Sequence, residues 1–300
     1  TKTGRFLWSD RSNIPSEKLA DLQDDVVREI VARIEPELNR VELSNLQQRR
    51  PVDLNAWSLY RRSHAILGQK GWNESSFKEA AELLRQAIKQ DPELAFAHAY
   101  LSLVLAIGHL IGLINNDTWH SEATNAAETA LVLDSQDSDV LGYAGCALAD
   151  MGELKRGKGM LEQALELNPS NAQAHAALGA VLISLGNENG VEKMRYGIRI
   201  SPRDNRLAAW GAILARGLLS MGRVEEAITE ANHACRCSDK IYLPRLVLAA
   251  AQITIGNTRS SKAALDDARR IFPGISHDEI SRFIMPGEIE RLKKAGLWVL

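Results

Sequence analysis

Cysteine, proline and aromatic residues are all scarce in this chain, which has three cysteines, nine prolines and 5% aromatic residues among its 300 residues. Long apolar runs are missing too, and none approaches the roughly 18 residues that a transmembrane helix needs. Neither sign of charge dominates, because 36 Lys and Arg stand against 38 Asp and Glu and give a net charge of −2. We therefore expect a protein that binds neither nucleic acid nor a membrane surface directly.

The three thiols, Cys146, Cys235 and Cys237, and the absence of a recognisable secretory leader argue against a disulfide framework. Both observations favour a reducing compartment, so we expect the protein to be cytoplasmic. The first residue is Thr1 rather than Met. This start suggests a segment of a longer polypeptide.

The composition, 45% hydrophobic and 25% charged, is that of a folded globular protein. The sequence also contains an internal repeat. Small residues recur at steps that centre on about 34 residues, at Ala87, Ala130, Ala164, Gly197, Ala234 and Ala268. A second small position recurs with the same steps, at Ala80, Ala123, Gly157, Gly190, Ala227 and Ser261. Helix-stopping prolines follow at Pro92, Pro169, Pro202 and Pro273, and turn glycines divide the units at Gly152, Gly186, Gly222 and Gly256. Each unit is therefore predicted to contain two helices of about a dozen residues.

This pattern has a packing explanation. Two antiparallel helices approach closely only where side chains are small, while larger apolar residues fill the groove between them. One amphipathic pair cannot bury its apolar face alone, so neighbouring pairs must stack into a continuous core.

The period, the helix-turn-helix unit and the small-residue and proline positions together resemble the tetratricopeptide (TPR) repeat family. Trp57, His98, Leu141 and His175 occupy the family's Trp position, and Leu178 and Gly179 match its Leu-Gly pair. The resemblance implies an all-α, right-handed superhelical solenoid of about six repeats over residues 53–275. The units begin near Asp53, Ala95, Ser138, Ala172, Asn205 and Tyr242. Extra residues at 68–76 and 108–120 are predicted to enlarge the turns inside the first two repeats.

Both flanking segments are predicted to contribute caps or contacts. Residues 1–15 look like a strand that belongs to an upstream domain. Residues 16–52 carry an amphipathic stripe that is broken near Pro36. This stripe predicts N-terminal capping helices or, alternatively, a homodimer contact. Residues 276–300 should form C-terminal capping helices. Ser276 and Glu279 make a capping box there, Pro286 starts a second helix and Gly296 ends it.

A second resemblance covers nearly the whole chain. It rests on the segments at 6–11 (FLWSDR), 21–25 (DLQDD), 34–38 (IEPEL) and 292–297 (LKKAGL). They resemble the C-terminal TPR region of bacterial class III adenylate or guanylate cyclases and of TPR-bearing winged-helix transcriptional regulators. The resemblance implies a regulatory region of a bacterial signalling protein, most closely the cyclase type, with the winged-helix regulator as the alternative output.

No motif in the chain indicates catalysis, a metal site or a cofactor. The Arg-Gly-Lys-Gly stretch at 156–159 falls in a predicted helix and lacks the spacing of a phosphate loop. Cys235 and Cys237 point apart on one helix, and no Gly-x-Ser-x-Gly turn exists to present a nucleophile. We therefore expect a non-enzyme. The alternative is a catalytic site in the insertion around Trp119 and His120.

The remaining candidate is the concave surface that the first helices of TPR repeats line. By the family's register, its candidate binding residues are Arg62, Phe96, Leu103, Asp139, Cys146, Asp150, Gln173, Ile183, Arg216 and Leu246. The lining is mostly small or apolar and lacks the Lys and Asn cluster that clamps a C-terminal carboxylate. An amphipathic helix or extended apolar peptide is the predicted guest. The alternative is that the chain's own N-terminal helix or long loops fill the groove.

Overall fold

The computed structural model describes residues 55–275 and 277–297, and these contain fourteen helices and no strand. The predicted strand-like segment at 1–15, the capping helices at 16–52 and the cap residue Ser276 lie outside the described residues. The boundaries between the solenoid and its caps stay predictions.

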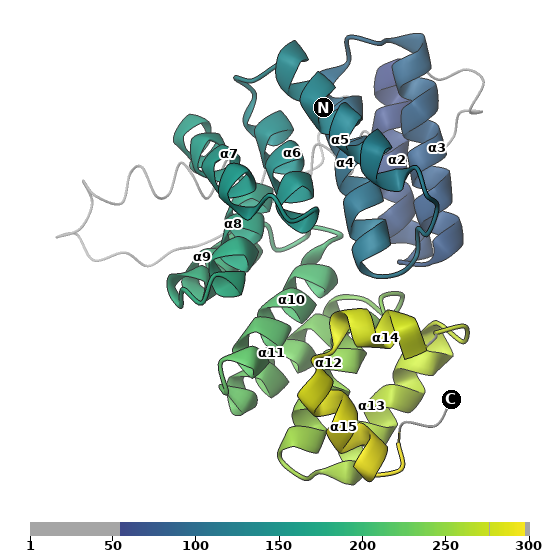
Figure 1. Cartoon of the computed structure of the whole chain (residues 1–300), viewed down its shortest axis with the longest axis vertical. Helices are drawn as coiled ribbons and strands as arrows, with labels where there is room; N and C mark the ends of the chain where they lie inside the picture. Colours follow the sequence, from purple (N-terminus) through teal and green to yellow (C-terminus); the bar gives the residue numbers. More distant parts are fainter. Residues whose placement is uncertain (1–54, 276, 298–300) are drawn as a thin grey trace, which may run out of the picture.

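Twelve of the helices form six consecutive pairs, and a further two follow them (Figure 1). The first helices of the pairs are α2 (Ala56–Lys70), α4 (Ala95–Leu110), α6 (Ser138–Asp150), α8 (Ala172–Ser184), α10 (Leu207–Ser220) and α12 (Leu243–Thr254). The second helices are α3 (Glu74–Gln90), α5 (Trp119–Leu133), α7 (Leu154–Leu167), α9 (Asn189–Ile200), α11 (Val224–Cys237) and α13 (Thr258–Ile271). The last two helices are α14 (His277–Phe283) and α15 (Pro286–Lys294). The all-α prediction is confirmed.

The helix pairs pack through the small residues that define the period. The alanines predicted at the two small positions, Ala80, Ala87, Ala123, Ala130, Ala164, Ala227, Ala234 and Ala268, are all fully buried, with no exposed surface. Gly157 in α7 lies so close to α6 that an added Cβ would stand 2.5 Å from the carbonyl oxygen of Gly145. The predicted turn glycines at 152, 186, 222 and 256 all have positive φ angles of 75–97°, as left-handed helix ends require.

The first insertion differs from its prediction. Residues 68–76 do not enlarge the turn, because α2 continues to Lys70 and α3 begins at Glu74. Asn73 and Ser76 form a reciprocal capping box that starts α3 at once, so the extra residues lengthen the two helices instead. The second insertion does include a loop, at 111–118, between α4 and α5.

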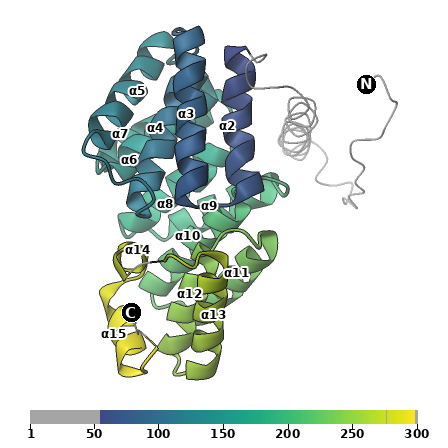
Figure 2. The ribbon, with the colours of Figure 1, turned by 90° about the vertical axis from the view of Figure 1, so that its right-hand side faces the viewer.

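The pairs stack in chain order, and each first helix contacts the first helix of the next pair. Arginine and glutamate pairs join second helices on the outside, as between Arg156 of α7 and Glu128 of α5. Figure 2 shows the resulting curved stack after a quarter turn about the vertical axis, with α2 and α3 at the upper end and α12–α15 at the lower end.

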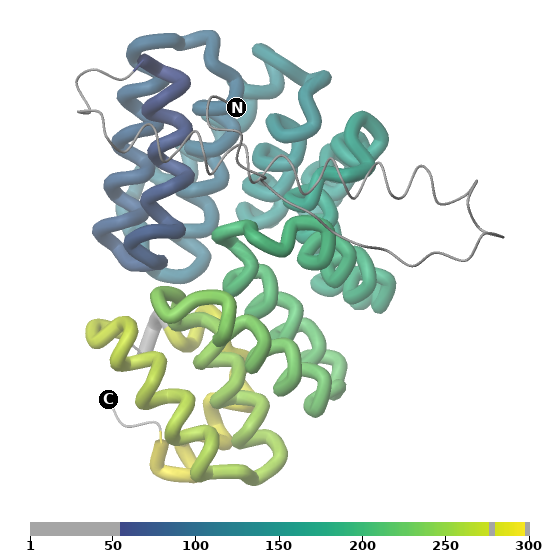
Figure 3. Tube along the Cα trace, turned by 180° about the vertical axis from the view of Figure 1, so that it is seen from behind, coloured from purple at the N-terminus to yellow at the C-terminus, as the bar shows by residue number. Residues whose placement is uncertain are grey.

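The superhelix also closes on itself. Asn205, before α10, donates from Nδ2 to the carbonyl oxygen of His64 in α2 at 3.1 Å. Lys240, before α12, donates from Nζ to the carbonyl oxygen of Gln69 at 2.6 Å. In Figure 3 the lower turn of the first helix pair lies directly above the later helices, where these contacts form. The chain therefore closes across part of the concave side of the solenoid.

The two C-terminal helices also contact the solenoid, in the region where the sequence predicts capping helices. Ile280, Phe283 and Leu292 are buried, and α15 packs on α12. Arg282 donates from Nη1 to the carbonyl oxygen of His109 at 3.0 Å, which links α14 to the end of α4. None of the described helices combines the length and the apolar character needed to cross a membrane.

Candidate functional site: a cavity on the inner surface

The closed superhelix surrounds a cavity of about 280 Å³. Its wall is built mainly by the inner faces of α4, α6, α8 and α10, and Trp72, Phe77 and Phe283 close it from the first helix pair and from α14. Most of the lining is apolar. The charged or polar side chains that reach it are Tyr100, Cys146, Asp150, Gln173, Ser184, Asn205, Arg206 and Arg216.

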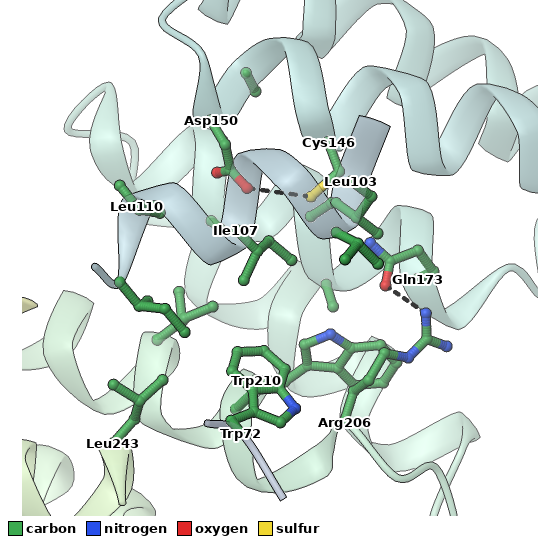
Figure 4. Close-up of a pocket in the computed structure, with 18 of the residues that line it drawn as sticks. Trp72, Leu103, Ile107, Leu110, Cys146, Asp150, Gln173, Arg206, Trp210 and Leu243 are labelled. Carbon is green, nitrogen blue, oxygen red and sulfur yellow. Dashed lines mark hydrogen bonds between the residues drawn. The ribbon is translucent and has the colours of Figure 1, made fainter. Parts of the chain in front are cut away.

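Half of the residues that the family register placed on the concave surface line this cavity. They are Leu103, Cys146, Asp150, Gln173 and Arg216, and Figure 4 shows the first four of these. Their common position on the inner face follows from helical periodicity and from the stacking of first helices, both of which the repeat pattern encodes. Their role in binding a guest stays a prediction.

The other five predicted residues lie elsewhere. Phe96 packs edge-to-face against Trp57 with ring centres 5.5 Å apart, and Asp139 accepts a hydrogen bond from Asn171 Nδ2 at 3.0 Å. Neither residue lines the cavity, nor does the half-buried Arg62.

Ile183 and Leu246 take part in packing. The Ile183 side chain lies against Gly217 of α10, where an added Cβ would stand 2.7 Å from Ile183 Cγ2. Leu246 is only 1% exposed, on the helix that α15 covers. Their binding role is likewise untested, but neither side chain forms part of the cavity wall.

Asp150 is the carboxylate of the cavity. It lies at the end of α6, where the Cys146 Sγ is 3.9 Å from its Oδ2, a long and weak contact (Figure 4). Burial raises the pKa of the Asp150 carboxyl to about 7. The pKa of the Cys146 thiol is raised well above its usual value, first by burial and then by Asp150, so this thiol stays protonated at neutral pH.

Arg206 is held differently, by partners on two elements. Its guanidinium binds Asp204 through Nε and Nη2, at 2.9 and 2.7 Å, and donates from Nη1 to Gln173 Oε1 at 2.8 Å. It also lies over the Trp210 ring, 4.8 Å from the ring centre. The arginine charge is therefore neutralised and fixed at one end of the cavity.

Sequence reasoning missed three residues that shape the site: Trp72, Arg206 and Trp210. Trp72 falls in the first insertion, and it reaches the cavity only because the superhelix closes, which no local pattern encodes. Arg206 immediately precedes α10. The sequence signal available for Arg206 was its spacing, because it follows Asp204 by two residues and precedes Trp210 by four.

Aromatic side chains surround the arginine end. His64 stacks on Tyr100 with ring centres 3.5 Å apart, and Tyr143 lies 5.2 Å from Tyr100. Burial lowers the pKa of His64 well below its usual value and raises the pKa of both tyrosines. These groups are consequently neutral near pH 7 and contribute shape rather than charge.

The alternative site around Trp119 and His120 is a surface feature. Trp119 stacks on His109, with ring centres 3.8 Å apart, while His120 is exposed. Within the described part of the chain, no cluster of three or more His, Cys, Asp or Glu residues is arranged to hold a metal ion. Gly157 and Gly159, weighed above as a phosphate loop, lie inside α7.

The fold is similar to those of solved structures. One is TTC0263, a thermophilic TPR protein in Thermus thermophilus, at 20% identity and a TM-score of 0.50, covering 66% of this chain and 99% of that one. Another is the hetero-tetramer of Cut9 and Hcn1 from the APC/C, at 16% identity and a TM-score of 0.59, covering 86% and 45% respectively. At these identities the likeness shows the fold, which is that of a TPR solenoid. No family model matches the chain.

One curated protein is similar in sequence. It is named "Putative adenylate cyclase 3", from Rhizobium meliloti (strain 1021), and is 32% identical over 149 residues. The match covers 49% of this chain and 24% of that protein. The similarity therefore concerns about a quarter of the length of this relative.

Proposed function

We propose that this chain is a protein-interaction and regulatory module of a bacterial signalling protein of the adenylate or guanylate cyclase type. The observation that carries the interaction role is the TPR solenoid itself, a stack of helix pairs with an inner surface made by the first helices. The sequence similarity to the Rhizobium meliloti protein named as an adenylate cyclase supports the signalling context.

We assign the predicted guest, an amphipathic helix or extended apolar peptide, to the concave surface made by the first helices. Part of that surface lines the cavity. The part outside the cavity wall, which includes Arg62 and Phe96, is called the rim here. We propose that the partner segment contacts this rim.

The rim offers an aromatic contact. Trp57 of α2 is 37% exposed, beside Phe96 of α4. The Arg61 guanidinium lies 5.9 Å from the Trp57 ring centre, and Arg62 is half-buried on the same helix. Exposed aromatic and arginine side chains are the residue types that dominate protein interfaces. The rim occupant is a partner segment or this chain's own N-terminal residues.

Photo-crosslinking from the rim tests this role. We expect Trp57→Ala to lower affinity for the captured partner at least tenfold, which corresponds to about 1.4 kcal/mol. Val132→Ala is the matched control, because Val132 is 85% exposed on the outer helix α5. The interaction role is contradicted if no partner is captured. It is also contradicted if Trp57→Ala and wild type capture the partner equally well.

The signalling context has a separate test, the coding sequence upstream of Thr1. A cyclase domain there, with cyclic nucleotide formation by the encoded protein, supports the proposal. A winged-helix domain supports the alternative regulator. An upstream sequence that encodes neither domain would contradict both the cyclase context and the winged-helix alternative.

A further inference from the structure

The charges that face the cavity are unequally partnered. Arg206 binds Asp204 and Gln173, and Arg216 lies over the Phe283 ring, 5.4 Å from its centre. Among the described residues, Asp150 forms no salt bridge, and its contact with Cys146 at 3.9 Å is weak. Within the described residues, Asp150 therefore faces the cavity without a bound cation, and Arg216 lines the same cavity without a bound anion.

An unbalanced carboxylate is expensive for the fold. Asp150 is half-buried, and withdrawing an unpaired charge from water destabilises the folded chain, a cost that asparagine in the same space would not carry. Apolar and neutral groups surround Asp150, including Ile107 and Leu110 on α4 and Leu154 on α7. A destabilising charge in a mostly apolar cavity indicates a site where a ligand supplies the missing partner.

The opposite side of the cavity is aromatic. Figure 4 shows Trp72 and Trp210 across the cavity from Asp150, with Ile107 between them. Trp72 comes from the first helix pair and Trp210 from the fifth. A molecule that lies between Asp150 and these two rings would need a polar head and an apolar body. It would contact both the first and the fifth helix pair.

We propose that the cavity binds a small organic amine, whose ammonium group pairs with Asp150 and whose apolar or aromatic body packs against Trp72 and Trp210. The volume of about 280 Å³ is at the lower end of the range for small-molecule sites. This inference goes beyond the proposed function and does not rest on it, because partner segments bind at the rim.

Binding of such an amine should depend on pH in one direction. The other titratable or charged groups that line the cavity are Tyr100 on α4, Cys146 on α6, and Arg206 and Arg216 around and on α10, while α7 and α8 contribute none. Burial raises the pKa of Tyr100 and Cys146, so both stay protonated near neutrality. Asp150 therefore governs the change, and amine affinity should rise between pH 6 and pH 8 as its carboxyl loses a proton.

Calorimetric titration with 4-phenylbutylamine, and with 4-phenylbutan-1-ol as its uncharged counterpart, tests the proposal on the chain as it stands. At pH 8 we expect the amine to bind at least tenfold more tightly than the alcohol. Asp150→Asn should bring the amine to the affinity of the alcohol, and Ala180→Phe should abolish binding of both by filling the cavity. Ser184→Ala, which alters an uncharged lining residue, should keep the preference for the amine.

Three results would overturn the proposal: no binding of the amine, equal binding of amine and alcohol, or an Asp150→Asn variant that binds the amine as wild type does. Circular dichroism of each variant shows that the fold is retained. The titration contains no protein partner, so its failure would leave the interaction role at the rim intact.

Discussion

Two glycines of α7, only two positions apart, have opposite surroundings. An added Cβ at Gly157 would stand 2.5 Å from the Gly145 carbonyl oxygen and 2.8 Å from Ala149 Cβ. At Gly159 the same atom would meet nothing within 4 Å. The first glycine therefore allows two helices to touch, while the second only weakens its own helix.

These surroundings predict effects of opposite sign. Gly157→Ala should destabilise the fold by about 1–3 kcal/mol, because backbone atoms block the new methyl group. Gly159→Ala should stabilise it by about 0.5–1 kcal/mol through higher helix propensity. Calorimetric melting temperatures that move in the same direction for both variants would contradict this account of the helix contact.

Asp150 predicts a pH-dependent stability difference. Its folded pKa of about 7 lies above the ordinary value of 3.8, so the folded chain keeps a proton that the unfolded chain has released between these values. The free energy of unfolding contributed by this group therefore falls as pH rises from about 4 to about 7, and stays low above that range.

Asp150→Asn should consequently raise the melting temperature at pH 8 by several degrees and change it little at pH 4. The exposed Asp117 provides the control, since Asp117→Asn should give the same small effect at both pH values. A stabilisation by Asp150→Asn that does not vary with pH would show that the carboxyl is not held in a desolvated site.

At the scale of helices, the sequence was most informative where structure depends on near neighbours. Ala87 and Ala130 could be placed between helices because packing of a pair repeats in every unit, and Gly152 could be placed at a turn because only a left-handed residue fits there. Leu103 and Asp150 could be assigned to the inner face for the same reason. Trp72 could not, because it reaches the cavity through contacts between the first and later helix pairs.

The link between α14 and the loop after α4 is one of those distant contacts. Arg282 donates to the carbonyl oxygen of His109 at 3.0 Å and lies 3.4 Å from Asn115 Oδ1. Arg282→Ala should speed amide hydrogen exchange in residues 111–118. Arg259→Ala, an exposed change on α13, should leave that exchange unchanged. Equal exchange in both variants would mean that the loop holds its position without α14.

At the scale of the whole molecule, the closure depends on close approach at Gly71. An added Cβ there would stand 2.3 Å from the carbonyl oxygen of Lys240. Gly222 has a similar positive φ angle, 75° against 78°, but nothing within 4 Å. Both alanine variants place a Cβ at a positive φ angle, and the strain is larger at Gly71, where ψ is −177°. Only Gly71→Ala also obstructs the contact between the first helix pair and the segment before α12.

Gly71→Ala should therefore open the superhelix, and small-angle scattering should report a larger radius of gyration. Gly222→Ala should melt at a lower temperature than wild type and keep the wild-type radius. If the two variants scatter alike, the contact at Lys240 does not hold the closed shape.

The distance across the closure tests the central claim most directly. Spin labels at Lys70→Cys and Asp239→Cys, both at exposed positions, can be measured by pulsed electron resonance after the native cysteines are replaced by alanine. The closed superhelix predicts one narrow population at short distance, which broadens and lengthens when Gly71→Ala is added. A broad, long distribution that Gly71→Ala leaves unchanged would show that the two ends do not meet and that no enclosed cavity exists.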